Sequence, residues 1–277
     1  MRRIVRLMGL LLASSAMLGA EEVMKDIEYG NAGGESLCLD ARVPPGEGPF
    51  PIAIIIHGGG WGSGDKTQDI DALFEPLTKA GFAWFSINYR LAPKHPWPAC
   101  FDDTRMAIGW VKAHARQYKG DPQRIALIGY SAGGQLALLA AIRADDSTRV
   151  QAVVGVAPAA DLVADSRRRG VVSKSLQNLL ILPEKLDEAA FAKIAAISPA
   201  EEVKPGLPPF LLLQGTADQS VRHEDTLAFA GKLQKAKVPC EFVSLEGAPH
   251  RISDWPKFSP DYPAKIVVWL TKVLGNG

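Results

Sequence analysis

Two short runs that are apolar at every position constrain the fold most strongly. Residues 52–56 read Ile-Ala-Ile-Ile-Ile and residues 125–128 read Ile-Ala-Leu-Ile. Strands of this kind are covered on both faces, as the inner strands of a parallel sheet are. Further β-branched runs alternate with longer amphipathic runs along the chain, which is typical of parallel strands joined by helices. The sequence therefore predicts an α/β fold with a mostly parallel sheet and helices on both faces.

The expected elements follow this alternation. We expect eight strands, at residues 22–29, 37–43, 51–57, 83–89, 124–129, 150–156, 210–214 and 241–245. We expect helices at residues 70–79, 103–117, 132–144, 223–235 and 263–274. The Asn-Ala-Gly-Gly stretch at 31–34 predicts a hairpin that makes one sheet edge antiparallel. Residues 161–206 break the alternation with short helical pieces, and we expect them to form an insertion over the carboxyl end of the sheet, as a lid or a substrate wall.

Residues 1–20 differ from the rest of the chain. Three arginines precede an apolar run at 7–18, and Gly19-Ala20 stands before two glutamates. This pattern is typical of a signal peptide and predicts a secreted or periplasmic α/β domain over residues 21–277. The run is shorter than the ~20 residues of a spanning helix, so we expect no stable membrane anchor, an uncleaved anchor being the alternative. Removing residues 1–20 changes the formal net charge from +1 to −2, which gives no indication of a nucleic-acid partner.

A candidate nucleophile lies directly after the second doubly apolar run. Residues 129–133 read Gly-Tyr-Ser-Ala-Gly, and a helical run follows. A strand that turns at once into a helix forces Ser131 into a strained backbone conformation, and small residues two positions away leave room for that turn. The hydroxyl is thereby placed at a helix N-terminus, where backbone N–H groups favour a developing oxyanion. We also expect Tyr130, its neighbour, to contact substrate.

A run of three glycines follows the third expected strand, in His57-Gly58-Gly59-Gly60-Trp61. Glycines allow backbone N–H groups to turn toward a substrate carbonyl, where they would join the N–H of Ala132 in an oxyanion hole. A phosphate-binding loop is disfavoured because the spacing of neither common phosphate motif is present. Trp61 is expected to line the acyl pocket, with a packing role as the alternative.

The candidate base is found by elimination among five histidines. Four of them fall in the glycine run, a Pro-rich stretch, a helix interior and a helix start. His250 remains, just beyond the last expected strand, where a loop can reach Ser131.

The candidate acid is Asp218, in Gly-Thr-Ala-Asp after the apolar strand at 210–214. A carboxylate there can accept the Nδ1–H of His250 and present Nε2 to the serine. Asp161, after the preceding strand, is the alternative acid. Asp102 and Asp103 are instead expected to cap the following helix.

Together with Gly-Asp-Lys at 64–66 and Asn-Tyr-Arg-Leu-Ala-Pro at 88–93, these motifs resemble the α/β-hydrolase esterases. The match is closest to the carbohydrate-esterase-like group that includes acetylxylan esterases and bifunctional feruloyl/acetyl-xylan esterases. The glycine run and 88–93 also resemble the hormone-sensitive-lipase group. The resemblance implies a three-layer sandwich on an eight-stranded sheet, with oxyanion donors at Gly58, Gly59 and Ala132. One departure is Arg251, where such enzymes often have glycine after the catalytic histidine.

The resulting prediction is a secreted serine carboxylesterase. It would hydrolyse short-chain or carbohydrate-linked acetyl or feruloyl esters through an acyl-enzyme intermediate, on small-molecule or polysaccharide substrates, with no metal and no cofactor. The alternatives are a peptidase or amidase of the same fold, including a formamidase, and a non-catalytic binding protein. We expect Cys38, Cys100 and Cys240 to be buried packing residues, with at most one disulfide. The sequence gives no indication of oligomeric state.

Overall fold

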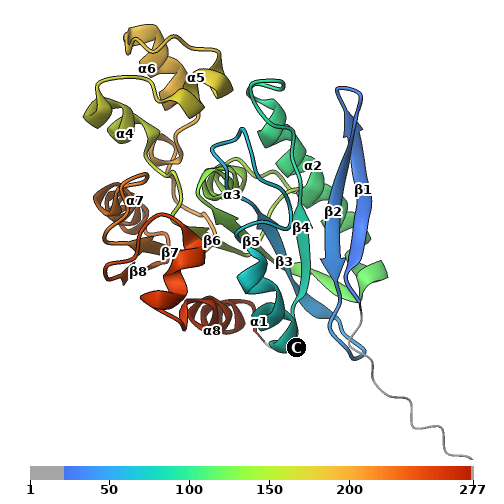
Figure 1. Cartoon of the computed structure of the whole chain (residues 1–277). Helices are drawn as coiled ribbons and strands as arrows, with labels where there is room; N and C mark the ends of the chain where they lie inside the picture. The colour runs from blue at the N-terminus through green and yellow to red at the C-terminus, as the bar shows by residue number, and fades with distance from the viewer. Residues whose placement is uncertain (1–21, 276–277) are drawn as a thin grey trace, which may run out of the picture.

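An eight-stranded sheet forms the centre of the molecule (Figure 1). The computed structural model describes residues 22–275, so the signal peptide expected at 1–20 lies outside the described residues. The strands are β1 (Met24–Ala32), β2 (Glu35–Arg42), β3 (Phe50–Ile56), β4 (Ala83–Ile87), β5 (Gly120–Tyr130), β6 (Ala152–Val156), β7 (Phe210–Gly215) and β8 (Cys240–Leu245). Their order across the sheet is β1-β2-β4-β3-β5-β6-β7-β8. The pairs β1/β2 and β2/β4 are antiparallel and the other pairs are parallel, which confirms the predicted α/β class.

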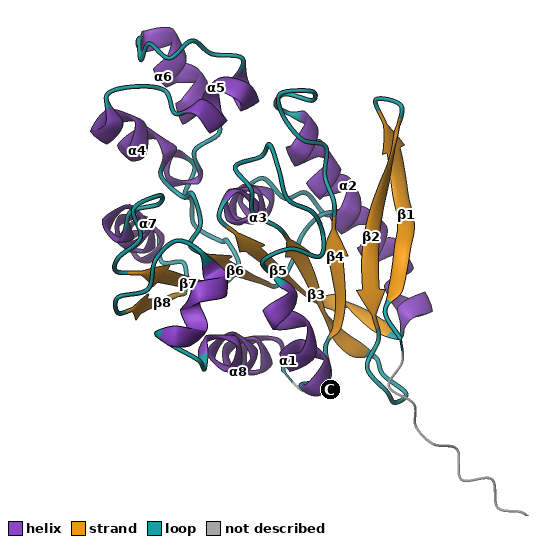
Figure 2. Cartoon of the chain, viewed as in Figure 1, coloured by secondary structure: helices purple, strands orange, loops and turns teal. Residues whose placement is uncertain are grey.

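Helices cover both faces of the sheet and complete the three layers (Figure 2). One face packs against α1 (Phe74–Lys79) and α8 (Tyr262–Leu274). The other packs against α2 (Ala99–His114), α3 (Ala132–Ile142) and α7 (His223–Lys235). The helix expected at 70–79 is a short 3-10 turn, Asp71–Leu73, that continues into α1.

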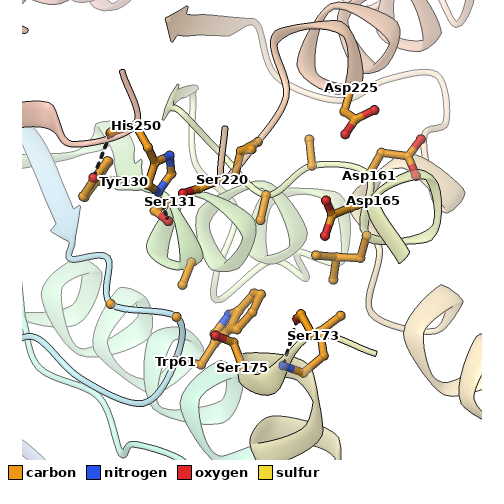
Figure 3. A pocket seen from close by; sticks show the side chains of 18 of the residues that line it. Trp61, Tyr130, Ser131, Asp161, Asp165, Ser173, Ser175, Ser220, Asp225 and His250 are labelled. Atoms are coloured by element: carbon orange, nitrogen blue, oxygen red, sulfur yellow. Dashed lines mark hydrogen bonds between the residues drawn. The ribbon is translucent and has the colours of Figure 1, made fainter. Parts of the chain in front are cut away.

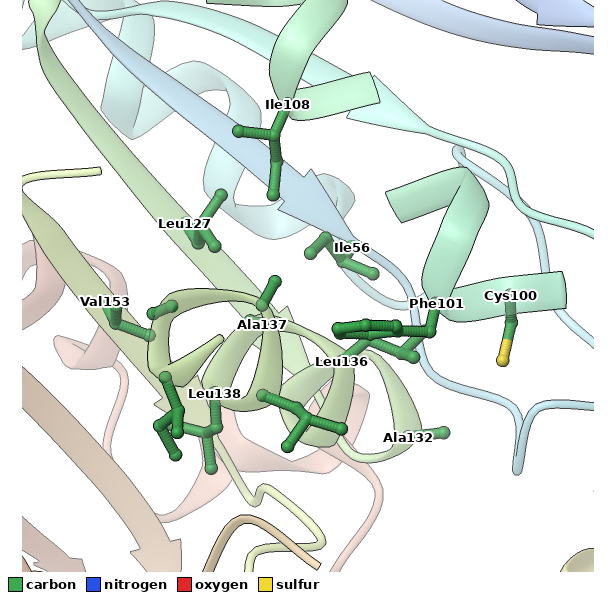
Figure 4. Packing of buried hydrophobic residues seen from close by; sticks show 14 of the residues in the cluster. Ile56, Cys100, Phe101, Ile108, Leu127, Ala132, Leu136, Ala137, Leu138 and Val153 are labelled. Carbon is green, nitrogen blue, oxygen red and sulfur yellow. The ribbon is translucent and has the colours of Figure 1, made fainter. Parts of the chain in front are cut away.

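Strand β3 shows why the doubly apolar runs lie in the middle of the sheet. Successive side chains of a strand point to opposite faces. Accordingly Ile52, Ile54 and Ile56 pack toward α2 and α3, while Ala53 and Ile55 pack toward α1 and α8. All five are fully buried, and burial of each isoleucine side chain contributes about 1.5–3 kcal/mol. Figure 4 shows Ile56 and Leu127 beside side chains of α2 and α3.

The predicted hairpin joins β1 to β2. Gly33 and Gly34 form its turn, with φ angles of 60° and 79°. Two consecutive positive φ angles are the requirement of a type I′ turn, which glycine meets without strain. The turn places β1 at the antiparallel edge, as the sequence predicts.

The insertion at 161–206 stands above the carboxyl end of the sheet (Figure 1). It contains α4 (Leu162–Arg169), α5 (Lys174–Leu180), α6 (Glu188–Ala195) and the 3-10 turn Pro199–Glu201. Its buried side chains Leu176, Leu179 and Ile194 belong to the same apolar cluster as α3. The hydrogen bonds that join it to the core include those from Trp97 N to Leu179 O (2.8 Å) and from Gln135 Nε2 to Ile197 O (2.8 Å).

The role predicted for Asp102 and Asp103 is wrong. Helix α2 begins at Ala99, so both residues lie inside its first turns rather than at its cap. The carboxylate of Asp103 is fully buried and accepts two bonds from the guanidinium of Arg90, from Nη2 (2.7 Å) and Nε (2.9 Å). The pairing of a charge with a donor fork offsets the loss of hydration that burial imposes. It raises the pKa of Arg90 and joins the 88–93 stretch to α2.

The cysteines are less uniform than predicted. Cys100 is buried on α2, whereas Cys38 and Cys240 are half-buried, and all three are free thiols. None of the helices within residues 22–275 combines the length and the apolar composition needed to cross a bilayer.

Candidate active site

Ser131 sits in a sharp turn between β5 and α3. Its backbone has φ 52° and ψ −116°, a conformation that a residue with a Cβ rarely adopts. The flanking glycines are required by space. A Cβ on Gly129 would lie 2.2 Å from the carbonyl oxygen of Gly133, and one on Gly133 would lie 2.2 Å from that of His57. The sequence Gly-Tyr-Ser-Ala-Gly therefore forms the tight elbow that its spacing predicts.

A chain of hydrogen bonds joins Ser131 to the two other candidate residues. Ser131 Oγ lies 2.9 Å from His250 Nε2, and His250 Nδ1 lies 2.7 Å from Asp218 Oδ2. A carboxylate oxygen can only accept, so Nδ1 carries the proton and Nε2 is free to accept the serine hydroxyl. Asp218 is fully buried after β7, whereas the His250 side chain keeps 23% of its exposure in the loop after β8.

Asp218 is held by four donors in total. Its Oδ1 accepts from the backbone N–H groups of Ser220 (2.8 Å) and Val221 (2.9 Å). Its Oδ2 accepts from Gln214 Nε2 (2.8 Å) in addition to His250. Sequence reasoning missed Gln214, although it is the one polar residue at the end of the apolar strand β7. These bonds keep the buried carboxylate aimed at His250.

Tyr130 contacts His250 through both its hydroxyl group and its ring. Its hydroxyl donates to the carbonyl oxygen of His250 (3.0 Å), and the two rings stack with centroids 5.6 Å apart. Burial raises the pKa of Tyr130 to about 12, so the phenol remains a proton donor at neutral pH. Tyr130 also lines the cavity, where the sequence analysis expected it.

The glycine run lies directly beside Ser131. A Cβ on Gly58 would lie 2.7 Å from the Tyr130 ring and 3.3 Å from Ser131 Cβ. Among the described residues, the backbone N–H groups of Gly58, Gly59 and Ala132 have no intramolecular acceptor. All three residues that the resemblance implies as oxyanion donors are thus brought to one place, next to the candidate nucleophile.

His57 braces this run from beneath. Its ring stacks on Tyr89 with centroids 4.3 Å apart, and Nδ1 donates to Gly58 O at 2.7 Å. The Tyr89 hydroxyl donates to His57 O (3.1 Å). Burial lowers the pKa of His57 to about 4, so the ring is neutral at neutral pH and adds no charge below the glycines.

A cavity of about 480 Å³ opens at Ser131. Ser131 and His250 lie on one side of it, and Asp161, Asp165 and Asp225 lie across from them (Figure 3). The insertion supplies part of the lining, through Asp161, Leu162, Asp165, Arg169, Ser173, Ser175 and Leu176. Trp61 lines the cavity while being 4% exposed, with its Nε1–H donated to Gln135 Oε1 (3.0 Å). It therefore has both the lining and the packing role that the sequence left open.

Asp161, the alternative acid, is used elsewhere. Its Oδ1 accepts from Ala164 N (2.9 Å) as the N-cap of α4, and its Oδ2 lies 3.3 Å from Lys232 Nζ. The structure gives it no bond to His250, whose Nδ1 is bonded to Asp218. Within residues 22–275, no group of three or more His, Cys, Asp or Glu side chains is arranged to hold a metal ion.

Comparison with known proteins places this chain in a family. The sequence profile of the BD-FAE family matches residues 39–233, which is more than half of the chain. The chain belongs to the BD-FAE family. It is 31% identical to the probable carboxylic ester hydrolase LipM of Mycobacterium tuberculosis, over 81% of this chain and 55% of that protein. It therefore spans about half the length of the curated relatives it matches.

Solved structures give the same fold. The apo form of Thermogutta terrifontis esterase 2 is 27% identical, with a TM-score of 0.72 over 91% of this chain and 92% of that one. A truncated carbohydrate esterase from gut microbiota is 22% identical, with a TM-score of 0.80 over 93% and 98%. The BD-FAE chain described here accordingly has the α/β-hydrolase fold that the motifs predict.

Proposed function

We propose that this BD-FAE protein is a serine carboxylesterase with Ser131 as nucleophile, His250 as base and Asp218 as the acid that orients it. The observation that carries the proposal is the unbroken hydrogen-bond chain Ser131–His250–Asp218 at the end of a cavity. Two further findings support it. Relatives that match most of the chain are named esterases. Of the three candidate oxyanion donors, Gly58 lies beside Ser131, and Gly59 and Ala132 line the same cavity as Ser131.

The proposed reaction begins with an ester carbonyl above Ser131. His250 Nε2 takes the hydroxyl proton as Oγ attacks, and Asp218 stabilises the imidazolium that forms. The N–H groups of Gly58, Gly59 and Ala132 bind the oxyanion of the tetrahedral intermediate. His250 then gives its proton to the departing alcohol. Water, activated by the same histidine, hydrolyses the acyl-enzyme and restores the serine.

The proposed substrates are short-chain or carbohydrate-linked acetyl or feruloyl esters. The far side of the cavity is polar, with carboxylates, Ser173 and Ser175 offering acceptors and donors to a hydroxylated alcohol. The resemblance of the motifs to acetylxylan and feruloyl esterases points the same way. Export through the expected signal peptide at 1–20 would bring the enzyme to extracellular polysaccharide.

The first experiment compares wild type, Ser131→Ala and His250→Ala on p-nitrophenyl esters of two to eight carbons. Turnover by wild type and its loss in both variants is the expected result. Turnover by Ser131→Ala equal to that of wild type would overturn the assignment of the nucleophile. The matching anilide separates an esterase from an amidase, since an amidase would cleave it at a comparable rate.

Substrate class and location need separate measurements. Release of acetate from acetylated xylan, or of ferulate from feruloylated arabinoxylan, is expected to accompany turnover of the aryl esters. If aryl esters are hydrolysed but neither polysaccharide is, the carbohydrate assignment fails and a general esterase remains. Cell fractionation followed by N-terminal sequencing tests export, and a cytoplasmic protein that begins at Met1 would refute it.

A further inference from the structure

Helix α4 of the insertion is bonded to the loop that carries the candidate acid. Arg169 Nη2 donates to the carbonyl oxygen of Ser220 (2.9 Å), across 51 residues of sequence. Arg169 is itself held by Asp165, whose Oδ2 and Oδ1 accept from its Nε at 2.8 and 3.0 Å. The Arg169 guanidinium is therefore bonded through Nε to its own helix and through Nη2 to the loop after Asp218.

Ser220 is held from both sides. Its N–H donates to Asp218 Oδ1 (2.8 Å), while its carbonyl oxygen accepts from Arg169. The loop from Gln219 to Val221 belongs to no helix or strand, and Ser220 itself is exposed. Apart from the bonds to Asp218, its backbone is tied down by Arg169 at Ser220 and by Gln214 Nε2 at Val221 O (3.0 Å). The position of the two N–H groups on the acid thus depends on a side chain from the insertion.

We infer that Arg169 is a positioning residue for catalysis, which fixes the Ser220 peptide so that Asp218 stays aligned with His250. The inference rests on the proposed function of these residues. It assigns the insertion a part in the chemistry, in addition to forming a wall of the cavity.

Loss of Arg169 should affect the step in which the Asp218–His250 contact is strongest. The carboxylate interacts more strongly with the imidazolium of the transition state than with the neutral ring of the resting enzyme. An interaction that strengthens in the transition state changes kcat and leaves the binding of substrate largely unaltered. Loss of Arg169 should therefore lower kcat for every ester by a similar factor.

Arg169 also lines the cavity, so a direct contact with substrate has to be separated from positioning. The test compares Arg169→Ala with the matched control Arg167→Ala. Arg167 lies on the same helix and is exposed, and its guanidinium lies over the Phe191 ring of the insertion, 5.5 Å from the ring centroid. Each purified protein is assayed on p-nitrophenyl acetate and p-nitrophenyl octanoate. Active sites are counted by stoichiometric titration with an aryl phosphonate, and the proton resonance of His250 Nδ1–H is recorded by NMR.

In Arg169→Ala we expect kcat per titrated site to fall about ten- to hundredfold on both esters, with KM within about twofold. The Nδ1–H resonance of His250 should shift or broaden, and Arg167→Ala should match wild type. A raised KM confined to the octanoate would make Arg169 a substrate contact and overturn the inference. Fewer titrated sites with unchanged kcat per site, or an unchanged Nδ1–H resonance, would also overturn it. A wild-type protein that turns over neither ester would instead refute the esterase function, and this inference with it.

Discussion

Two regions enclose the cavity, and different kinds of interaction hold them in place. The catalytic rim consists of residues 57–60, 129–133, 218 and 250, at the carboxyl ends of the strands. Backbone geometry fixes it, because several of its glycines have no room for a Cβ. The insertion wall, residues 161–206, is fixed by apolar packing and by partly exposed ion pairs such as Arg168–Asp225. The rim therefore tolerates little change of side chain, whereas most side chains of the wall can be replaced one at a time, with Arg169 as the inferred exception.

Removal of the nucleophile should give the largest effect. In Ser131→Ala we expect kcat on p-nitrophenyl acetate to fall by about 10⁴- to 10⁶-fold, since the covalent route is lost. The thermal unfolding midpoint should not fall, because within residues 22–275 the hydrogen bond to His250 is the one that Ser131 Oγ makes. A variant that retains more than a hundredth of the wild-type kcat would show that the rim does not carry the chemistry.

A single methyl group in the glycine run should give the next largest effect. A Cβ on Gly58 would overlap the Tyr130 ring, so the run must move and misplace an oxyanion donor. We expect Gly58→Ala to lower kcat about 10²- to 10³-fold.

The matched control for that substitution is Gly231→Ala in α7, where a Cβ would meet no atom within 4 Å. It should leave kcat unchanged and add up to about 1 kcal/mol of stability. Equal kcat values for Gly58→Ala and Gly231→Ala would show that the rim is no more sensitive to an added methyl group than a helix outside it.

The buried ring of His57, at the start of the rim's glycine run, predicts a pH-dependent stability. Its pKa of about 4 lies below the 6.5 of an unperturbed histidine, so the unfolded chain is protonated first as the pH falls. The stability that neutral His57 contributes is present above pH 6.5 and lost as the pH falls toward 4. This lowering of the His57 pKa corresponds to about 3 kcal/mol in the free energy of unfolding.

Urea unfolding of wild type and His57→Gln at pH 7.5 and pH 4.5 measures this contribution. The carboxylates titrate alike in both proteins, so the variant should lose less stability between the two pH values. Parallel losses would show that His57 is not held neutral by burial.

Substitution of a wall residue that lines the cavity without contacting the loop after Asp218 should change selectivity rather than chemistry. Ser175 lines the cavity beside the glycine run, and a phenylalanine there would occupy space that bulky esters need. We expect Ser175→Phe to lower kcat/KM for the octanoate ester about tenfold relative to the acetate. Lys174→Phe, one residue away and outside the cavity lining, should leave the ratio unchanged. A uniform loss on both esters would place Ser175 with the rim.

The same contrast decides what the sequence could predict. The elbow at Ser131 and the glycine run are local patterns, so their backbone requirements can be predicted from consecutive residues. The strands at 52–56 and 125–128 can be predicted because every residue in them is apolar. The Arg90–Asp103 pair, the Gln214–Asp218 bond and the Arg169–Ser220 bond depend on side chains that meet only after folding. Neither the residue types nor their spacing in the sequence predicts such long-range contacts. For that reason the sequence predicts a helix cap for Asp103, and it offers no periodic pattern that defines the helices of the insertion.

The positive φ of Ser131 has a consequence for how the protein can be altered. A non-glycine residue in a sparsely populated backbone region carries about 1–3 kcal/mol of strain, and glycine at 131 would release it. A laboratory search for heat-resistant variants that scored folding alone would therefore be drawn toward replacing the proposed nucleophile. Under the proposed mechanism stability and turnover compete at this position, so selection on ester hydrolysis would be needed to keep the serine.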